Sequence, residues 1–348
     1  MEPNQTHPVA AATSLDVATL AGVSKTAVSL VLNGRGDEHG LSPDTQSRIR
    51  VAADALGYTP NHAARSLRRQ RSNIITFLTA DLGNRYFAEV MASAEDAARA
   101  RGYVVNVISA RSADAETEAF KRLGGGISDG LMVHGGSIRT SAGIALLRRR
   151  GLACVLLQDA GADTKIPCVR VDIAEGGLLA TQHLLSLGHR SVAHITDRRL
   201  SGKLVNDRLI GYRKALETAG IAFDPNLVIQ ADNSFAGGDA AMRMLMNTTQ
   251  RPSAVFVFND QMAIGGLHAL AADRLRVPED VAVVGFDGTE LGAFTTPELT
   301  TIDHPRAELG RWAATTVMDQ LAGSTVQEMR TLPVRLVVRA SCGGLTDT

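Results

Sequence analysis

The chain has 348 residues, three cysteines and a formal net charge of zero. Its length predicts two or three domains, and its 45% apolar and 21% charged residues are ordinary for a soluble globular protein. No run approaches the ~18 apolar residues of a membrane span. The first dozen residues lack the pattern of a signal peptide. An odd number of cysteines argues against a disulfide framework. We therefore expect a cytoplasmic protein without a membrane partner.

Residues 14–33 predict two short helices joined by a tight turn. Thr13 or Ser14 can cap the first helix, and Gly22 permits a turn that a residue with a Cβ would strain. Ser24 can cap the second helix, in which three apolar side chains at i, i+3 and i+4 can dock inward: Val28, Val31 and Leu32. The pattern is typical of a helix-turn-helix, whose second helix enters a DNA major groove, although an ordinary helical hairpin would share it.

A third helix and a basic segment follow. Residues 34–40 form a glycine-rich loop that cannot continue a helix, and Ser42 with Pro43 then predict the start of a third helix. Residues 61–72 hold four arginines and no acid, whereas residues 1–72 as a whole carry eight Lys/Arg and six Asp/Glu. Such a locally positive segment can bind phosphates. It also predicts a short helix, which would be largely unfolded by itself in water. It is a candidate switch, with a solvated linker as the plainer alternative.

From Asn73 onward, nine apolar and β-branched segments alternate with helical stretches. Continuous rather than alternating hydrophobic strands, separated by helices, indicate parallel sheets covered on both faces. Nine strands are many for one sheet, so we expect two lobes of four to five strands each. A ligand would sit between the lobes, at the carboxyl ends of the strands. The segment 299–339 adds a predicted helix and strand, so the chain is expected to recross between the lobes.

Several motifs taken together resemble the lactose/purine repressor (LacI/GalR) family of bacterial transcription regulators. The N-terminal part contains DVATLAGVSKTAVSLVLN, LSPDT, GYTPN and ARSLRRQRS, and the later part contains VFNDQMAIGGLHAL, RVPEDVAVVGFDG and TPELTTIDHP. The resemblance covers nearly the whole chain. It implies an all-α helix-turn-helix DNA-binding domain joined to an α/β, periplasmic-binding-protein-like core of two parallel-sheet lobes. It also implies a homodimeric repressor that binds a pseudo-palindromic, double-stranded operator and a small effector, often a sugar or nucleobase.

Domain boundaries follow from this reading of the chain. We expect a helix-turn-helix domain at 1–59, a hinge at 60–72 and an effector-binding and dimerisation domain at 73–343. Within that domain the lobes are expected at about 73–172 and 173–298, with the chain recrossing in 299–343.

The resemblance also implies which residues contact DNA. Lys25 can donate to guanine in the major groove, and an apolar wedge such as Leu67 can unstack a base step in the minor groove. Many relatives have arginine at the position of Leu30, where contact with a thymine methyl would replace a guanine contact. The full set comprises Lys25, Thr26, Ala27 and Leu30 at the bases, Ser24, Ser29, Arg65 and Arg68 at phosphates, and Ala64 and Leu67 in the minor groove.

Residues expected in the effector cleft come from both lobes. The resemblance implies Tyr86, Phe87, Asp159, Arg208, Asn233, Phe235, Asn259, Asp260 and Asp287. Carboxylates, amides and one arginine beside an aromatic wall suit a neutral, hydroxyl-rich ligand such as a sugar. Relatives often have a stacking aromatic where this chain has Asn233, and Phe235 could substitute for it. Each carboxylate at a strand end could instead be a turn or helix cap.

Two other classes of function were weighed. An α/β enzyme is disfavoured because the glycine clusters lack dinucleotide- or phosphate-loop spacing, no nucleophile elbow occurs, and the nine histidines show no metal-ligand spacing. We expect neither a cofactor nor a metal. A secreted solute-binding protein of the same two-lobed fold is disfavoured by the helix-turn-helix and by the first dozen residues. The effector, the operator sequence, and the choice between repressor and activator or dimer and tetramer stay open.

Overall fold

The computed structural model describes residues 12–59, 71–79, 82–110, 112–134, 149, 151–158, 165–198 and 207–344. The chain separates into two compact units, residues 1–72 and residues 73–348. No single helix among the described residues is long and apolar enough to cross a membrane.

The first unit contains three helices, α1 (Ser14–Ala21), α2 (Lys25–Leu32) and α3 (Pro43–Ala55). The Thr13 N–H donates to the Asp16 carboxylate at 2.8 Å, and the Asp16 N–H donates to Thr13 Oγ1, which closes a capping box at the start of α1. Gly22 ends α1 at a φ of 64°, and the two helices are bent by 103°, as in a helix-turn-helix. Their buried core consists of Val17, Ala18, Ala21, Val28, Val31, Ile49, Ala52 and Ala53.

The glycine-rich loop between α2 and α3 is anchored by Gln46, a buried residue of α3. Its Nε2 donates to Asp37 Oδ1 at 2.7 Å and to the Leu41 carbonyl at 2.9 Å. A Cβ on Gly36 would lie 2.6 Å from the Gln46 side chain, so a larger residue at this position would require that side chain to shift. The loop therefore has a specific structure packed on α3.

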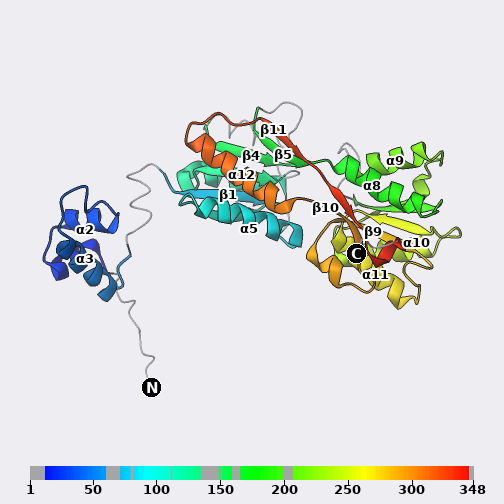
Figure 1. Cartoon of the computed structure of the whole chain (residues 1–348), viewed down its shortest axis with the longest axis horizontal. Coiled ribbons are helices and arrows are strands. Elements are labelled where there is room, and N and C mark those ends of the chain that lie inside the picture. The colour runs from blue at the N-terminus through cyan, green and yellow to red at the C-terminus, as the bar shows by residue number, and fades with distance from the viewer. Residues whose placement is uncertain are drawn as a thin grey trace, which may run out of the picture. The chain divides into compact units, whose positions relative to one another are not determined.

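The second unit is built from two lobes, each with a six-stranded sheet (Figure 1). The first sheet is parallel, with strand order β11-β5-β4-β3-β1-β2. Helices α5 and α12 lie side by side on one face, and α6 packs on the other. The elements are β1 (Ile74–Thr79), α5 (Arg85–Arg99), β2 (Val104–Ser109), α6 (Ala113–Arg122), η1 (Leu123–Ile127), β3 (Gly130–His134), β4 (Ala153–Leu157), β5 (Cys168–Val171), α12 (Arg306–Leu321) and β11 (Met329–Leu332).

The second sheet has the order β12-β10-β9-β8-β6-β7, with β12 antiparallel to β10. Helices α8 and α9 cover one face, and α10 and α11 cover the other. The elements are α8 (Ile173–Ser186), β6 (Val192–Asp197), α9 (Asp207–Thr218), η3 (Pro225–Leu227), β7 (Val228–Ala231), α10 (Phe235–Met246), β8 (Ala254–Val257), α11 (Asp260–Ala272), β9 (Ala282–Asp287), η4 (Glu290–Phe294), β10 (Thr300–Asp303), β12 (Arg335–Val337) and η5 (Ala340–Cys342).

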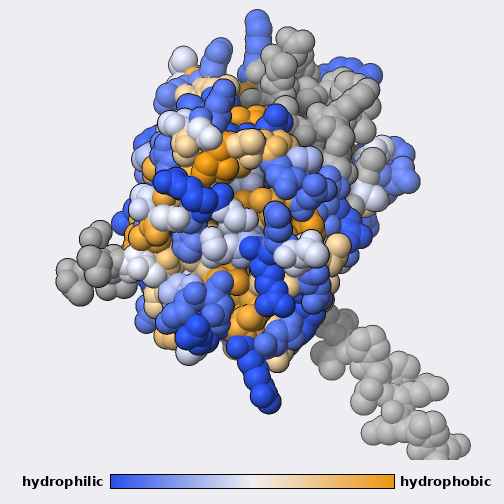
Figure 2. Space-filling view, turned by 90° about the vertical axis from the view of Figure 1, so that its right-hand side faces the viewer, coloured by the Kyte–Doolittle hydropathy of each residue, from blue (hydrophilic) through white to orange (hydrophobic). Residues whose placement is uncertain are grey.

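Within the described residues the chain passes between the lobes three times, after β5, after β10 and after β11. Figure 1 shows the C-terminal strands running from one lobe to the other. The expectation of four to five strands per lobe was wrong, because β10 extends the second sheet directly after β9, and β11 and β12 then add one strand to each sheet. On the side of the second lobe seen in Figure 2, apolar side chains form separate patches on a mostly hydrophilic surface.

Candidate DNA-binding surface and interlobe site

The first turn of α2 presents a polar surface. Ser24, Lys25 and Thr26 are exposed, whereas Ala27 and Leu30 are partly buried against the rest of the unit. Ser24 Oγ accepts a hydrogen bond from the Ala27 N–H at 3.1 Å, so its hydroxyl proton is left to donate outward. The exposed N-terminal turn of a second helix is the part of a helix-turn-helix that contacts base edges.

The C-terminal end of α2 is stabilised by contacts between Asn33 and Ser29. Asn33 Nδ2 donates to the Ser29 carbonyl at 2.5 Å and lies 3.5 Å from Ser29 Oγ. Ser29 is partly buried, so it is less accessible to a phosphate than Ser24. The expected phosphate and minor-groove contacts of the hinge, namely Ala64, Arg65, Leu67 and Arg68, lie outside the described residues.

Tyr86 and Phe87 lie in the first turn of helix α5. Asn84 caps this helix by accepting from the Tyr86 N–H at 3.0 Å. The Tyr86 hydroxyl accepts from Gln158 Nε2 at 3.0 Å, and burial raises the pKa of this phenol. Phe87 packs edge-on against Tyr86 at 5.1 Å and against His134 at 4.6 Å between ring centroids. Both rings belong to the core of the first lobe, and Tyr86 also contacts His304 of the interlobe connection at 5.4 Å between ring centroids.

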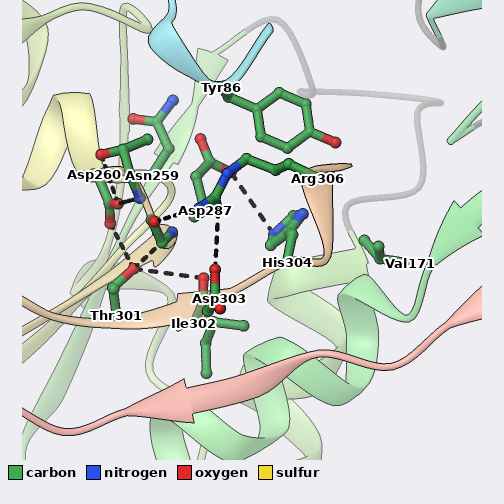
Figure 3. Close-up of polar contacts among 12 residues, drawn as sticks. Tyr86, Val171, Asn259, Asp260, Asp287, Thr301, Ile302, Asp303, His304 and Arg306 are labelled. Carbon is green, nitrogen blue, oxygen red and sulfur yellow. Dashed lines mark hydrogen bonds and ion pairs between the residues drawn. The ribbon is translucent and has the colours of Figure 1, made fainter. Parts of the chain in front are cut away.

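Asp287, at the end of β9, is the centre of the polar cluster between the lobes (Figure 3). Its carboxylate is 3.5 Å from Arg208 Nη2, 3.5 Å from Asn84 Nδ2 and 3.8 Å from His304 Nε2. All three distances are at or beyond the upper limit for hydrogen bonds. Burial raises the pKa of Asp287 to about 7, and the Arg208 guanidinium opposes that rise.

Arg208 enters the cluster from the start of α9. Its guanidinium lies between the rings of Phe258 and Phe286, at 4.2 Å and 4.0 Å from their centroids, and its side chain is 11% exposed. The Nε is buried without a hydrogen-bond partner. Burial lowers the pKa of Arg208, and the neighbouring Asp287 carboxylate counteracts this. The arginine can therefore still donate to a ligand oxygen.

A chain of amides lies beside this cluster. Asn259 caps α11 by accepting from the Met262 N–H at 2.9 Å, and its Nδ2 donates to Asn233 Oδ1 at 2.8 Å. Asn233 Nδ2 in turn donates to Asp197 Oδ2 at 3.2 Å. Phe235, at the start of α10, is 46% exposed. Asp197 was not among the residues expected from the sequence, although a carboxylate at the end of a buried strand is the available signal.

Asp260 has a different position, because it is completely buried. Its carboxylate accepts from the Thr289 N–H at 2.6 Å, from Thr289 Oγ1 at 2.9 Å and from Thr301 Oγ1 at 2.6 Å. Burial raises the pKa of Asp260 to about 6, and these hydrogen bonds oppose the rise. These contacts connect Asp260 to the turn that follows Asp287. Asp159 lies outside the described residues.

Two further residues, His304 and Arg306, join the lobes and were not expected from the sequence. His304 is buried and lies edge-on to Tyr86 at 5.4 Å. Arg306 donates to Glu89 at 2.6 Å, to Asp303 at 3.0 Å, and to the backbone carbonyls of Asp287 and Gly288. Both follow β10. The motif TPELTTIDHP contains His304, but it indicated the family and not a contact of this side chain.

A pocket of about 330 Å³ lies nearby and is lined by residues of both lobes. Its charged side chains are paired with one another, Arg85 with Glu290 at 3.9 Å and Arg306 with Glu89 at 2.6 Å. Because its lining contains no aromatic side chain and these charges are compensated, the Asp287 cluster is the better candidate for ligand binding.

Comparison with known proteins gives concordant matches for both units. Residues 13–61 match the model of the bacterial regulatory proteins of the lacI family, and residues 181–342 match that of the periplasmic binding protein-like domain. The ribose operon repressor of Haemophilus influenzae is 33% identical, covering 89% of this chain and 92% of its own. The transcriptional repressor CytR of Escherichia coli is 31% identical, covering 96% and 97%.

Solved structures agree with these sequence matches. The lac repressor dimer bound to operator and an anti-inducer is similar with a TM-score of 0.81 and 29% identity, over 95% of this chain and 99% of that one. The complex of the transcriptional regulator CelR with cellobiose is similar with a TM-score of 0.71 and 30% identity, over the same shares of the two chains.

Proposed function

Because the chain belongs to the lacI family of bacterial regulatory proteins and is a ligand-responsive DNA-binding regulator, we propose that it represses genes of carbohydrate or nucleoside use. The exposed first turn of α2 would read the operator, and a small neutral effector bound between the lobes would change operator affinity. The protein would act in the cytoplasm, where chromosomal DNA is found. Relatives named for ribose and a structure with bound cellobiose support a sugar effector.

The observation that carries this proposal is the combination of two sites in one chain. The first unit has a capped helix-turn-helix with Ser24, Lys25 and Thr26 exposed. The second unit has a buried Arg208–Asp287 pair whose contacts are too long for good hydrogen bonds. A ligand hydroxyl could give Arg208 or Asp287 a hydrogen bond of normal length, as expected of a site that binds hydroxyl groups.

The regulator is proposed to bind DNA as a homodimer, as the similar lac repressor does. Two copies of α2 would then reach two half-sites about one helical turn apart, which predicts a pseudo-palindromic operator. Effector binding that changes lobe geometry would alter how the two hinges meet on DNA. A coupling of ~1–3 kcal/mol would change operator affinity roughly 5–150-fold.

Selection of duplexes from a random DNA library tests the DNA-binding part. We expect the full chain to enrich a palindromic sequence, and Lys25→Ala to weaken binding by ~1–3 kcal/mol and relax the preference at one base pair. Fluorescence anisotropy at fixed salt measures both effects. Lys121→Ala, which removes an exposed lysine of α6 in the second unit, is the control. Equal binding of all duplexes, or an unchanged preference in Lys25→Ala, would contradict the assignment.

A further inference from the structure

Asn73 is the first residue of the second unit and directly follows the basic segment at 61–72. Its backbone has a φ of 53°, in the left-handed region that residues with a side chain rarely adopt, although asparagine tolerates it better than most. The next residue, Ile74, begins the extended strand β1. The chain therefore enters the second unit through a sharp turn at one residue, and not as a straight extension of β1.

The backbone of Asn73 is held by hydrogen bonds on both sides. Its N–H donates to Asp129 Oδ2 at 2.8 Å, and its carbonyl accepts from the Val104 N–H at 2.9 Å. Val104 begins β2 and Asp129 directly precedes β3, and these are the two strands that flank β1 in the first sheet. Both backbone polar groups of the turning residue are therefore tied to the sheet.

The Asp129 side chain is the part of this arrangement that depends on residue type. The contact from Val104 joins two backbone groups, so any residue at that position other than proline could make it. The Asp129 carboxylate accepts the Asn73 N–H in partly buried surroundings, where a charged acceptor gives a stronger hydrogen bond than a neutral one. The Asp129 N–H also donates to the Ile74 carbonyl at 2.8 Å, which fixes this residue beside the turn.

A fixed chain direction at Asn73 has a consequence for DNA binding by two copies of the chain. Two half-sites of an operator have one separation and one rotation about the DNA axis, and both must be reached at once. A junction that rotated freely would have to be ordered on binding, at a cost in affinity, and would accept half-sites at several separations. A junction held in one conformation favours a single separation.

We propose that Asp129 is a positioning residue for operator recognition, which holds Asn73 in its turned conformation and so restricts the half-site spacing that the dimer accepts. The inference rests on the proposed function, since it requires a homodimer on a pseudo-palindromic operator. It goes beyond that function by assigning the choice of spacing to a residue far from the interlobe cluster. Asp129 lies at the opposite end of β3 from His134, whose ring packs on Tyr86.

Operator spacing provides a readout that a change in stability alone does not move. The duplex enriched by selection is compared with the same duplex carrying one extra base pair at its centre, which shifts one half-site by about 3.4 Å and about 35°. Fluorescence anisotropy of the full-length protein at fixed salt gives the ratio of the two dissociation constants. Thermal unfolding of each variant shows whether it is folded under the assay conditions.

Three substitutions separate the hydrogen bond from other effects. Asp129→Ala removes the acceptor, whereas Asp129→Asn keeps an amide oxygen that can accept the Asn73 N–H. Asn73→Pro removes the donor and imposes a negative φ, so it breaks the same contact from the other side. Asp114→Ala, which removes an exposed carboxylate of α6 in the same lobe, is the control.

We expect wild type, Asp129→Asn and the control to prefer the selected spacing by about tenfold or more, and Asp129→Ala and Asn73→Pro by less than about threefold. An unchanged ratio in folded Asp129→Ala, or a wild type that accepts both spacings equally, overturns the inference alone. Equal relaxation in Asp129→Asn or in Asp114→Ala also overturns it. If Asp129→Ala does not fold, the ratio for Asn73→Pro decides in the same way. Selection that enriches no palindromic duplex overturns the proposed function and this inference with it.

Discussion

Asp287 combines an uncommon backbone conformation with a buried carboxylate in the interlobe cluster. Its backbone has a φ of 108°, a conformation that a residue with a side chain rarely adopts, and the residue is 5% exposed. Such strain costs of order 1–3 kcal/mol and is found mainly where function requires it. The backbone twist aims the carboxylate at Asn84, Arg208 and His304, while Arg306 binds the carbonyl of the same residue. The strained backbone of Asp287 is therefore explained by the direction in which it points the carboxylate, and not by a gain in stability.

The raised pKa of Asp287 predicts a pH dependence of stability. Its folded-state pKa of about 7 lies above the ordinary value of 3.8, so the native state binds the proton more tightly. The stabilisation is complete below the ordinary value and is lost as pH rises through the folded-state pKa, at no more than ~1.4 kcal/mol per pH unit. Relative to wild type, Asp287→Asn should therefore gain stability between about pH 5 and about pH 8.

Urea unfolding of both proteins at the two pH values measures this gain. Asp280→Asn serves as the control, because the hydrogen bonds from Arg276 lower the pKa of Asp280 to about 2. Its contribution is lost only in acid, so its stability difference from wild type should stay flat over the same pH interval. A flat difference for Asp287→Asn as well would show that Asp287 does not titrate there.

At the scale of elements, the close crossing of α5 and α12 positions the first-lobe half of the site. A Cβ on Gly310 would lie 2.0 Å from the Val90 carbonyl oxygen and 2.3 Å from Ser93 Oγ, so the two helices approach as closely as glycine allows. Helix α5 begins at the site residues Asn84 to Phe87, and α12 begins with Arg306. The packing of these helices therefore fixes the relative positions of Tyr86 and Arg306.

Gly310→Val is expected to destabilise the protein by ~3 kcal/mol or more, because one helix must move away from the other. The midpoint of thermal or urea unfolding of the second unit measures the loss. Gly125→Ala is the matched control, since a Cβ at that glycine of η1 meets nothing within 4 Å, and it should change stability by less than about 0.5 kcal/mol. Equal stability of the two variants would mean that the helices separate at little cost.

At the scale of the effector-binding unit, a small number of polar contacts join the lobes in the described residues. Arg306 has the most contacts of these residues, because it bonds Glu89 of α5 and, at the same time, Asp303 and the backbone after β9. Two longer contacts also join the lobes. Arg85 lies 3.9 Å from Glu290, and Asn84 lies 3.5 Å from Asp287. A ligand that adds several hydrogen bonds between the lobes can shift their arrangement.

Arg306→Met is accordingly expected to loosen the lobes and reduce effector affinity about tenfold or more, since the ligand must then also order them. Calorimetric titration gives the affinity, and small-angle scattering of the ligand-free protein should give a larger radius of gyration. Arg101→Met provides the comparison, because its ion pair with Asp319 joins elements of the first lobe only. An effect of the same size in Arg101→Met would argue for general destabilisation instead of loss of the interlobe contact.

Local patterns in the sequence determined the elements and the family. Capping residues such as Ser24 and Ser42, the turn glycine at position 22 and the nine apolar strand segments all act within a few residues, so they could be interpreted directly. The Arg208–Asp287 pair was accessible only because the family motifs placed both residues at the cleft. The burial of Asp260, the amide chain through Asn233 and the burial of His304 were decided by the tertiary structure. Each depends on residues that are far apart in the sequence and meet only in the folded second unit.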